Sequence, residues 1–384
     1  MYKRVINLKM KTNRIKTILS LMLILSSTIG AFCQTKKVVR QKQTPVATKP
    51  VSKAQSNRKT WISLNVFREG LICAENANYK YGFLDKTGKT VIPFKWDYAA
   101  SFHQGFAMVK DQDGKYGFID KTGKLVIPCT WKYAYDFYEG FAMVKDESDK
   151  YGFIDETGTI VIPCEWNIDD KGFFRYDYRF FEGLAMVKGE NKKYGFIDKT
   201  GKVVVPCEWN EAKPFSEGLA VVLGKGAKEG YLNYGFIDKT GKLIVPCRWT
   251  RAESFSDGLA VVVDDNWHYG FVDKTGSVVI PCQWKEAEPF SESLAVVKGE
   301  NGKYGYIDKT GKVVITCQWQ RAESFSEGLT IVEDSNYKKG YIDKTGKVVI
   351  PCKYTRANSF KEGFALVGMG DVDIIINKKG ERVF

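Results

Sequence analysis

The stretch Tyr304-Gly305-Tyr306-Ile307-Asp308-Lys309-Thr310-Gly311-Lys312-Val313-Val314-Ile315 decides the fold, because versions of it recur from Tyr81 almost to the C-terminus. The intervals between copies are 35, 35, 35, 43, 40, 35, 35 and 35 residues. A period of this kind is the signature of a repeat architecture. When each copy is started at an aromatic residue, nine copies begin at Trp61, Trp96, Trp131, Trp166, Trp209, Trp249, Trp284, Trp319 and Tyr354.

One half of each copy has the chemistry of a β-hairpin. In Asp120-Lys121-Thr122-Gly123, Asp suits the first position of a type I turn, and Gly can take the positive φ of the bulge that follows it. The flanking segments are rich in aromatic and β-branched residues, which favour strands. Gly117 inside a strand predicts a close backbone approach, and Pro128 is expected to end the strand.

The other half of each copy predicts a third short strand, such as Gly140 to Val144. Between the strands, Trp249, Ala252 and Phe255 recur at a spacing of three residues. This spacing keeps one face apolar through a short or 3₁₀ helical turn. Each copy is therefore expected to contain three strands and one turn.

The fold class is all-β, a tandem array of about nine repeats of roughly 35 residues. We expect an open, twisted, solenoid-like array, with the degenerate last copy capping its end. The alternative is a β-propeller, which typically has four to eight blades of four strands.

Two segments precede the array, which spans residues 61–384. Residues 1–33 combine six basic residues, a short apolar run and small residues before Cys33, a pattern typical of a secretory signal peptide. We expect cleavage after Cys33; the alternative is a lipoprotein anchored at that cysteine. Residues 34–60 contain eight basic residues, two prolines and no acidic residue, and predict a flexible linker.

These two segments account for the basic composition. The chain has 58 basic and 45 acidic residues, but residues 1–60 hold 14 of the bases and none of the acids. The array is therefore close to neutral, which argues against a nucleic-acid partner. No segment of the mature chain is apolar enough to predict a transmembrane helix.

Two copies carry insertions, and insertions in repeats map to loops that often bind ligands. The copy starting at Trp166 gains eight residues within 169–176, and the copy starting at Trp209 gains five within 224–230. The candidate binding residues in and beside these insertions are Phe173, Phe174, Tyr176, Tyr178, Lys225, Lys228 and Tyr231.

The residues that could carry other chemistry recur with the repeat. Seven cysteines occupy one position after the strand-ending proline, and equivalent positions separated by three strands lie too far apart for disulfides. We therefore predict free, buried thiols. No Cys-x-x-Cys pattern occurs, and only His103 and His268 are histidines, so we expect no metal, no cofactor and no catalytic group. The recurring Asp and Glu residues are interpreted as turn caps.

The combination of Tyr-Gly-Phe-Ile-Asp-Lys-Thr-Gly with a downstream Ile-Pro, an aromatic residue, Phe and Glu-Gly resembles the bacterial WG repeat, also called the KWG repeat. The resemblance covers residues 61–384, although Tyr stands here where the family's name motif has Trp. It implies an all-β repeat in an exported or surface-associated protein, without a general biochemical activity.

Three functions remain open from the sequence. The first is a non-enzymatic exported protein whose extended surface binds a protein or a cell-envelope polysaccharide. The second is a structural spacer or envelope component without a specific ligand. The third is an enzyme, which would need a non-repeating cluster of polar groups. The sequence does not decide the oligomeric state.

Overall fold

A computed structural model of the protein describes residues 61–168, 178–226, 232–370 and 372–383. These residues belong to one compact unit, Arg58–Phe384. They form nine antiparallel β-sheets and no helix, so none of them forms a helix that could cross a membrane. The all-β repeat array expected from the sequence is confirmed.

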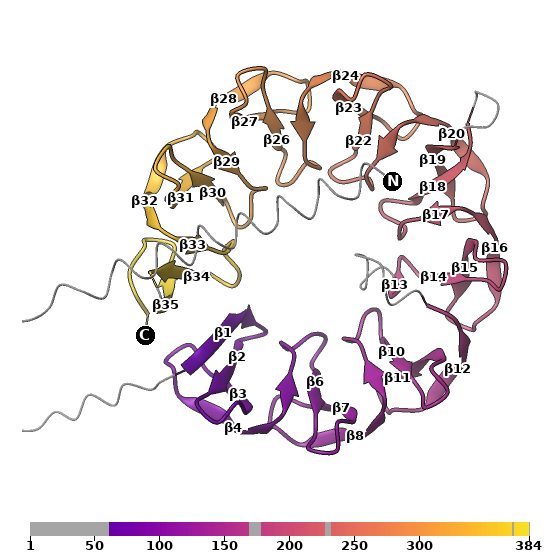
Figure 1. Ribbon diagram of the computed structural model, residues 1–384, viewed down its shortest axis with the longest axis vertical. Coiled ribbons are helices and arrows are strands. Elements are labelled where there is room, and N and C mark those ends of the chain that lie inside the picture. Colours follow the sequence, from indigo (N-terminus) through magenta and orange to yellow (C-terminus); the bar gives the residue numbers. More distant parts are fainter. Residues whose placement is uncertain (1–60, 169–177, 227–231, 371, 384) are drawn as a thin grey trace, which may run out of the picture. The chain divides into compact units, whose positions relative to one another are not determined.

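Each sheet is one blade of a ring, and the blades follow the phase of the repeat (Figure 1). Blade 1 contains β1 (Trp61–Arg68), β2 (Leu71–Asn76), β3 (Tyr81–Leu84) and β4 (Thr90–Trp96). Blade 2 contains β5 (Tyr98–Ala99), β6 (Ala107–Lys110), β7 (Tyr116–Ile119) and β8 (Leu125–Trp131), and blade 3 contains β9 (Tyr133–Ala134), β10 (Phe141–Lys145), β11 (Tyr151–Asp155) and β12 (Ile160–Trp166).

The next three blades repeat this order. Blade 4 contains β13 (Phe180–Phe181), β14 (Leu184–Lys188), β15 (Tyr194–Asp198) and β16 (Val203–Trp209). Blade 5 contains β17 (Glu211–Ala212), β18 (Leu219–Lys225), β19 (Leu232–Asp238) and β20 (Leu243–Trp249), and blade 6 contains β21 (Arg251–Ala252), β22 (Ala260–Val263), β23 (Tyr269–Val272) and β24 (Val278–Trp284).

The last blade is shorter than the others. Blade 7 contains β25 (Glu286–Ala287), β26 (Ala295–Lys298), β27 (Tyr304–Ile307) and β28 (Val313–Trp319), and blade 8 contains β29 (Arg321–Ala322), β30 (Leu329–Glu333), β31 (Lys339–Asp343) and β32 (Val348–Tyr354). Blade 9 has three strands, β33 (Arg356–Ala357), β34 (Phe364–Met369) and β35 (Val372–Asn377).

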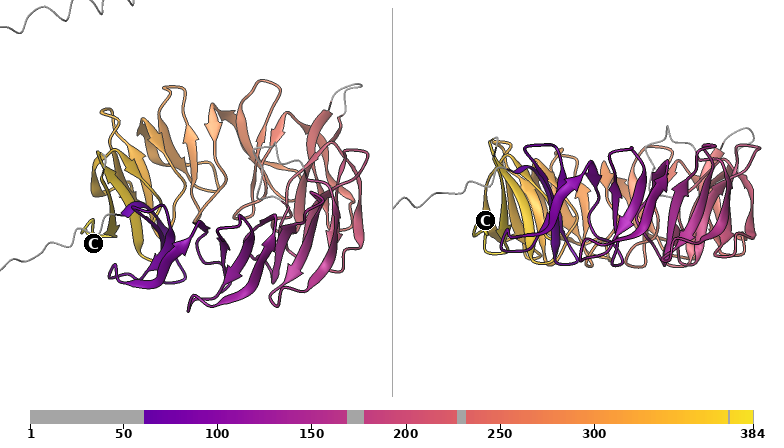
Figure 2. Two further views of the ribbon diagram at one scale, coloured as in Figure 1. Left: turned by 60° about the horizontal axis from the view of Figure 1, so that its bottom comes forward. Right: turned by 90° about the horizontal axis from the view of Figure 1, so that it is seen from below.

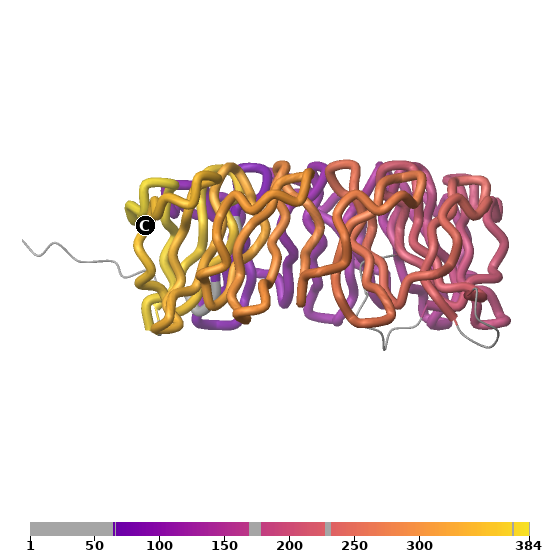
Figure 3. Tube along the Cα trace, turned by 90° about the horizontal axis from the view of Figure 1, so that it is seen from above, coloured from indigo at the N-terminus to yellow at the C-terminus, as the bar shows by residue number. Residues whose placement is uncertain are grey.

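The ring is closed, so the open array that we favoured is wrong and the propeller alternative holds. Figures 2 and 3 show the ring from the side, one blade high. Blades 1 and 9 pack against each other through a shared apolar cluster that includes Phe67, Ile72 and Ile375. The Phe67 and Phe364 rings lie 4.9 Å apart. The degenerate last copy therefore completes the ring with blade 1 and does not cap a free end.

Blades 1 to 8 have four strands where three were expected. The missed strand is the first and innermost one, and in most blades it is only two residues long (Figure 1). It lies where the sequence predicted a helical turn. Trp249, Ala252 and Phe255 are all buried, as expected, but the chain stays extended and passes from blade 5 to blade 6 between Trp249 and Arg251.

The hairpin between the third and fourth strands has the predicted turn. Asp308 Oδ1 accepts hydrogen bonds from the Thr310 N–H at 2.9 Å and the Thr310 hydroxyl at 2.6 Å. Gly311 has a φ of 85°, which favours glycine. The close approach predicted at Gly117 is also present, because a Cβ there would lie 2.5 Å from the Ile127 carbonyl oxygen.

In blade 2, Pro128 follows the equivalent turn and does not end the strand, contrary to expectation. β8 continues through Pro128 to Trp131. β8 is the last strand in its sheet, and an edge strand tolerates a residue without an N–H donor. The proline thus protects the outer edge of the blade from pairing with another strand.

The predicted free thiols are confirmed for the described residues, but full burial holds for only two of them. Their eight cysteines are free, with Cys73 and Cys247 buried and the others half-buried. Cys33, the export segment and the basic linker lie outside the described residues.

Candidate functional site

Neighbouring blades are joined by one recurring contact, which we call the clasp. The Glu of each Glu-Gly turn accepts a hydrogen bond from the backbone N–H of the equivalent turn in the next blade. Examples are Glu182 to Gly218 at 3.0 Å and Glu327 to Gly363 at 3.0 Å. Each clasp Glu therefore caps a turn, as the sequence predicted, and the turn that it caps belongs to the neighbouring blade.

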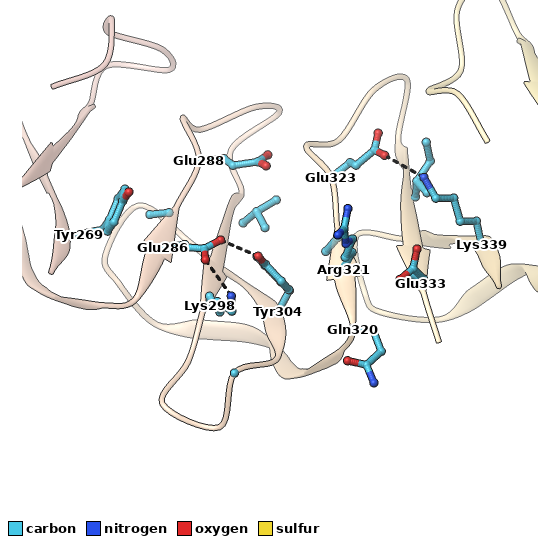
Figure 4. A pocket seen from close by; sticks show the side chains of 15 residues that line it. Tyr269, Glu286, Glu288, Lys298, Tyr304, Gln320, Arg321, Glu323, Glu333 and Lys339 are labelled. Atoms are coloured by element: carbon cyan, nitrogen blue, oxygen red, sulfur yellow. Dashed lines mark hydrogen bonds and ion pairs between the residues drawn. The ribbon is translucent and has the colours of Figure 1, made fainter. Parts of the chain in front are cut away.

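A cleft with a volume of about 750 Å³ lies between blades 7 and 8. It is lined by residues of β25 to β27 and β29 to β31, and by Tyr269 of β23. Four glutamates and three basic residues line it, together with small and branched apolar side chains. Figure 4 shows these side chains on the two facing walls.

On the blade 7 wall, Glu286 is fully engaged by its neighbours. Its carboxylate accepts a hydrogen bond from the Tyr304 hydroxyl at 2.5 Å and pairs with Lys298 Nζ at 2.8 Å (Figure 4). Burial opposes ionisation of Glu286, but Lys298 and Tyr304 outweigh it and lower its pKa. This group is therefore a satisfied ion pair that shapes the wall.

Glu288 and Glu323 are less well satisfied. They project from the inner ends of blades 7 and 8 at similar heights in Figure 4. The Glu288 carboxylate reaches across to blade 8, where the Ser324 hydroxyl donates to it at 3.0 Å. Lys339 lies 3.8 Å from Glu323, at the limit of an ion pair.

The pKa values of both carboxyls are raised. For Glu288 the main cause is desolvation, to which the negative charge of Glu286 adds. The Glu288 residue is nevertheless exposed, whereas Glu323 is half-buried. For Glu323 the main cause is again desolvation, and the charge of Glu288 adds to it while Lys339 opposes it. A cation beside either carboxyl would favour its charged form.

The cleft does not have the composition of a metal site. Among the described residues, no group of three or more His, Cys, Asp or Glu side chains is arranged to hold a metal ion.

The repeat is recognised by the model of one protein family, described as the WG containing repeat. It matches residues 81–116, 116–150, 151–167, 194–228, 234–266, 269–304, 304–337 and 340–372, well over half of the chain. The chain belongs to the WG-repeat family. The cleft lies between its repeats 7 and 8, and no curated protein matches the chain.

Two solved structures show weak likeness to this WG-repeat protein. The crystal structure of BamB from Moraxella catarrhalis is 12% identical, with a TM-score of 0.39, covering 82% of this chain and 96% of that chain. The extracellular domain of the hybrid two-component system BT3049 from B. thetaiotaomicron is 9% identical, with a TM-score of 0.24, covering 82% and 56%.

The candidate residues in the insertions are mostly outside the described structure, namely Phe173, Phe174, Tyr176, Lys228 and Tyr231. Of the two described ones, Tyr178 is 5% exposed and lies in a core cluster of blades 3 to 5. Lys225 is exposed at the end of β18. The structure does not bring Tyr178 or Lys225 to the cleft between blades 7 and 8.

A second non-repeating feature runs along the turns of blades 2 to 4. The His103 ring stacks on Tyr138 at 4.3 Å, and the Arg179 guanidinium covers Tyr138 at 4.0 Å. Asp136 lies beside these groups, and desolvation raises its pKa although His103, Arg179 and Arg68 oppose the shift. These contacts join side chains of blades 2, 3 and 4, so the cluster packs neighbouring blades together.

Sequence reasoning missed the cleft because its residues lie inside regular copies. A signal was present: Glu253, Glu288 and Glu323 occupy the same repeat position in blades 6 to 8, where blades 2 and 3 have Ala100 and Tyr135. The backbone therefore places this position at the same point of each blade, while the side chain there differs between blades.

Proposed function

We propose that this WG-repeat protein is a non-enzymatic, exported protein whose ring binds a protein partner or a cell-envelope glycan. The observation that carries the proposal is the cleft between blades 7 and 8. A ring built only for support needs the same contact at every joint, and the clasp supplies it. The cleft between blades 7 and 8 is a charged cavity in addition to this contact, and its volume of about 750 Å³ is in the range of ligand sites.

Export is supported by the first 33 residues, whose basic segment, apolar run and small residues are typical of a signal peptide. The near-neutral array gives no support to a nucleic-acid partner. The alternative is a structural spacer without a specific ligand, which would leave the cleft unused.

A pull-down from envelope extracts and a glycan-array screen with the full chain test the proposal. We expect a specific ligand whose binding is lost in the double variant Glu288→Gln/Glu323→Gln. The matched control is Glu190→Gln, since Glu190 is exposed between β14 and β15. Absence of any ligand from both screens would favour the spacer.

An enzyme is the remaining alternative, because carboxyls with raised pKa values that line one cleft are also used in proton transfer. Incubation of the full chain with a panel of envelope glycans separates binding from turnover. Cleavage that disappears in Glu288→Gln would replace the binding proposal.

A further inference from the structure

At the joint between blades 5 and 6, a lysine of this chain lies at the place that corresponds to the cleft between blades 7 and 8. Lys213 in blade 5 and Glu253 in blade 6 both lie four positions after the aromatic start of their copy. Lys213 Nζ crosses between the blades, where it donates to the Ala252 carbonyl at 3.1 Å and pairs with Glu253 Oε2 at 2.5 Å. A lysine ammonium is thus held at this joint by a carbonyl and a carboxylate.

The same acceptors recur at the joint between blades 7 and 8, but the lysine does not. Blade 8 offers Ala322 and Glu323, the equivalents of Ala252 and Glu253. The residue that faces them from blade 7 is Glu288, whose carboxylate touches blade 8 at Ser324. A carboxylate therefore stands where the joint between blades 5 and 6 has an ammonium group, and the cleft lies at this joint.

We propose that the cleft binds the ammonium group of a lysine side chain from a partner protein, between Glu288 and Glu323 and beside the Ala322 carbonyl. This inference rests on the proposed binding function and names the group that is bound. Three acceptors match the three N–H donors of an ammonium group, whereas a guanidinium presents a planar fork.

The lining favours a lysine over an amino sugar. Ala287, Val296, Ala322 and Ile331 supply apolar surface in the cleft, and such surface suits the four-carbon stem of lysine. The amine of an amino sugar is attached directly to its ring and has no stem to place there. Of the three basic residues of the cleft, Lys298 is paired with Glu286, Lys339 lies 3.8 Å from Glu323, and Arg321 is the third. The bound ammonium group therefore shares Glu323 with Lys339.

The direct test uses the blocked tripeptide acetyl-Gly-Lys-Gly-amide and the full chain, with binding measured by saturation-transfer NMR. We expect transfer to the lysine side-chain methylenes, none to the peptide with an Nε-acetylated lysine, and at least tenfold weaker binding to Glu288→Gln/Glu323→Gln. The control Glu190→Gln should bind as the unmodified protein does. Equal binding of the acetylated peptide, or competition by glucosamine at the same concentration, would overturn the proposal.

A second variant introduces into blade 7 a lysine that corresponds to Lys213 of blade 5. In Glu288→Lys the new lysine should take the place that Lys213 has between blades 5 and 6, so that the tripeptide no longer binds while Tm is unchanged or higher. A lower Tm with retained tripeptide binding would contradict the inference.

The two proposals can fail separately. If the pull-down finds a partner whose binding survives Glu288→Lys and lysine acetylation, the binding function stands and the lysine site is wrong. If the tripeptide binds but no partner or glycan is found, the lysine site stands and the proposed function fails.

Discussion

At the scale of single residues, blade 7 departs from the repeat at Ser293. In the other eight blades this turn position is a glycine with φ between 82° and 89°. Ser293 has a φ of 73°, a conformation that costs an L-residue roughly 1–2 kcal/mol. The Ser293 N–H receives the clasp from Asp257 at 2.7 Å, so the turn is held despite this cost.

We predict that Ser293→Gly stabilises the protein by about 1 kcal/mol, measured as the free energy of unfolding in urea. The mirror variant Gly258→Ser, at the same position of blade 6, should lose a similar amount. If Ser293→Gly were destabilising, the serine side chain would have a favourable role that its backbone conformation does not reveal.

The thiols give a second residue-scale prediction. Burial, and to a lesser degree the charge of Glu75, raises the pKa of Cys73 to about 12, and burial raises the pKa values of Cys129 and Cys282 to about 11. Because the thiolate is the reactive form, the native protein should react with iodoacetamide at pH 8 far more slowly than the urea-unfolded protein. Mass spectrometry of the labelled chain measures this difference. Fast labelling of Cys73 in the native state would mean that blade 1 opens readily.

At the scale of repeated elements, the clasp is usually accompanied by a lysine. The lysine after the turn Asp of the next blade pairs with the clasp Glu, as in Lys239 with Glu182 at 3.1 Å and Lys344 with Glu292 at 3.1 Å. Blade 3 has Glu156 in place of this lysine, and the clasp residue facing it is Gln104, which binds the Gly140 N–H at 3.1 Å. The two substitutions together avoid placing two carboxylates side by side.

This pair predicts a charge-swap result. Gln104→Glu alone should destabilise the protein by about 0.5 kcal/mol, because it puts a second carboxylate near Glu156 at an exposed site. Gln104→Glu/Glu156→Lys restores the arrangement of the other joints and should recover the loss. A double-mutant cycle in urea measures the coupling, and additive effects would show that the two side chains do not interact.

The turn aspartates give a prediction on pH. Hydrogen bonds from the neighbouring threonine hydroxyl and backbone N–H groups lower the pKa values of Asp120, Asp198, Asp308 and their equivalents below the ordinary 3.8. A carboxyl with a lowered folded pKa binds fewer protons when folded, so its contribution is complete above its unfolded pKa and is lost as pH falls through the folded pKa.

The free energy of unfolding should therefore fall steadily as pH drops below about 4. Urea titrations between pH 6 and pH 2.5 measure the slope, and Asp308→Asn should reduce it because one titrating group is removed. A stability that is unchanged over this range would mean that the turns keep their hydrogen bonds when protonated.

The repeat phase, the hairpin turn and the free cysteines could be predicted from the sequence because each depends on local chemistry. The hydrogen bonds that Thr310 donates to Asp308, and the close approach of Gly117 to Ile127, need only residues within one hairpin. The first strand could not be recognised, since two residues such as Arg321 and Ala322 carry no alternating pattern. The cleft could not be found either, because it depends on which repeat positions face each other across a joint.

At the scale of the whole molecule, closure distinguishes the ring from the open array. Eight joints connect blades that are consecutive in the chain, and the joint between blades 9 and 1 connects its two ends. Glu362 supplies the clasp there and accepts from the Gly70 N–H at 2.8 Å and from the Glu69 N–H. No strand of one end pairs into the sheet of the other among the described residues.

The closing joint also lacks a hydrogen bond that the four joints between blades 5 and 9 share. Between blades 5 and 9, a serine hydroxyl at each joint donates to the next blade, as in Ser216 to the Phe255 carbonyl at 2.7 Å. Lys361 replaces this serine at the closing joint. Burial and the nearby charge of Arg68 lower the pKa of Lys361, while Glu327 opposes the shift. A lysine therefore stands at the closing joint where the joints between blades 5 and 9 have a serine hydrogen bond.

We therefore predict that removing the same carboxylate has different results at the two kinds of joint. Glu217→Ala should cost about 1 kcal/mol, because one hydrogen bond and one exposed ion pair are lost while the chain still holds blades 5 and 6 together. Glu362→Ala removes both backbone contacts at the only joint without a covalent connection, so blades 9 and 1 should separate before the ring unfolds. Hydrogen exchange should then become faster in β1, β2 and β34 but stay slow in blades 4 to 6. Equal exchange in the two variants would mean that the Phe67 and Phe364 cluster closes the ring without the clasp.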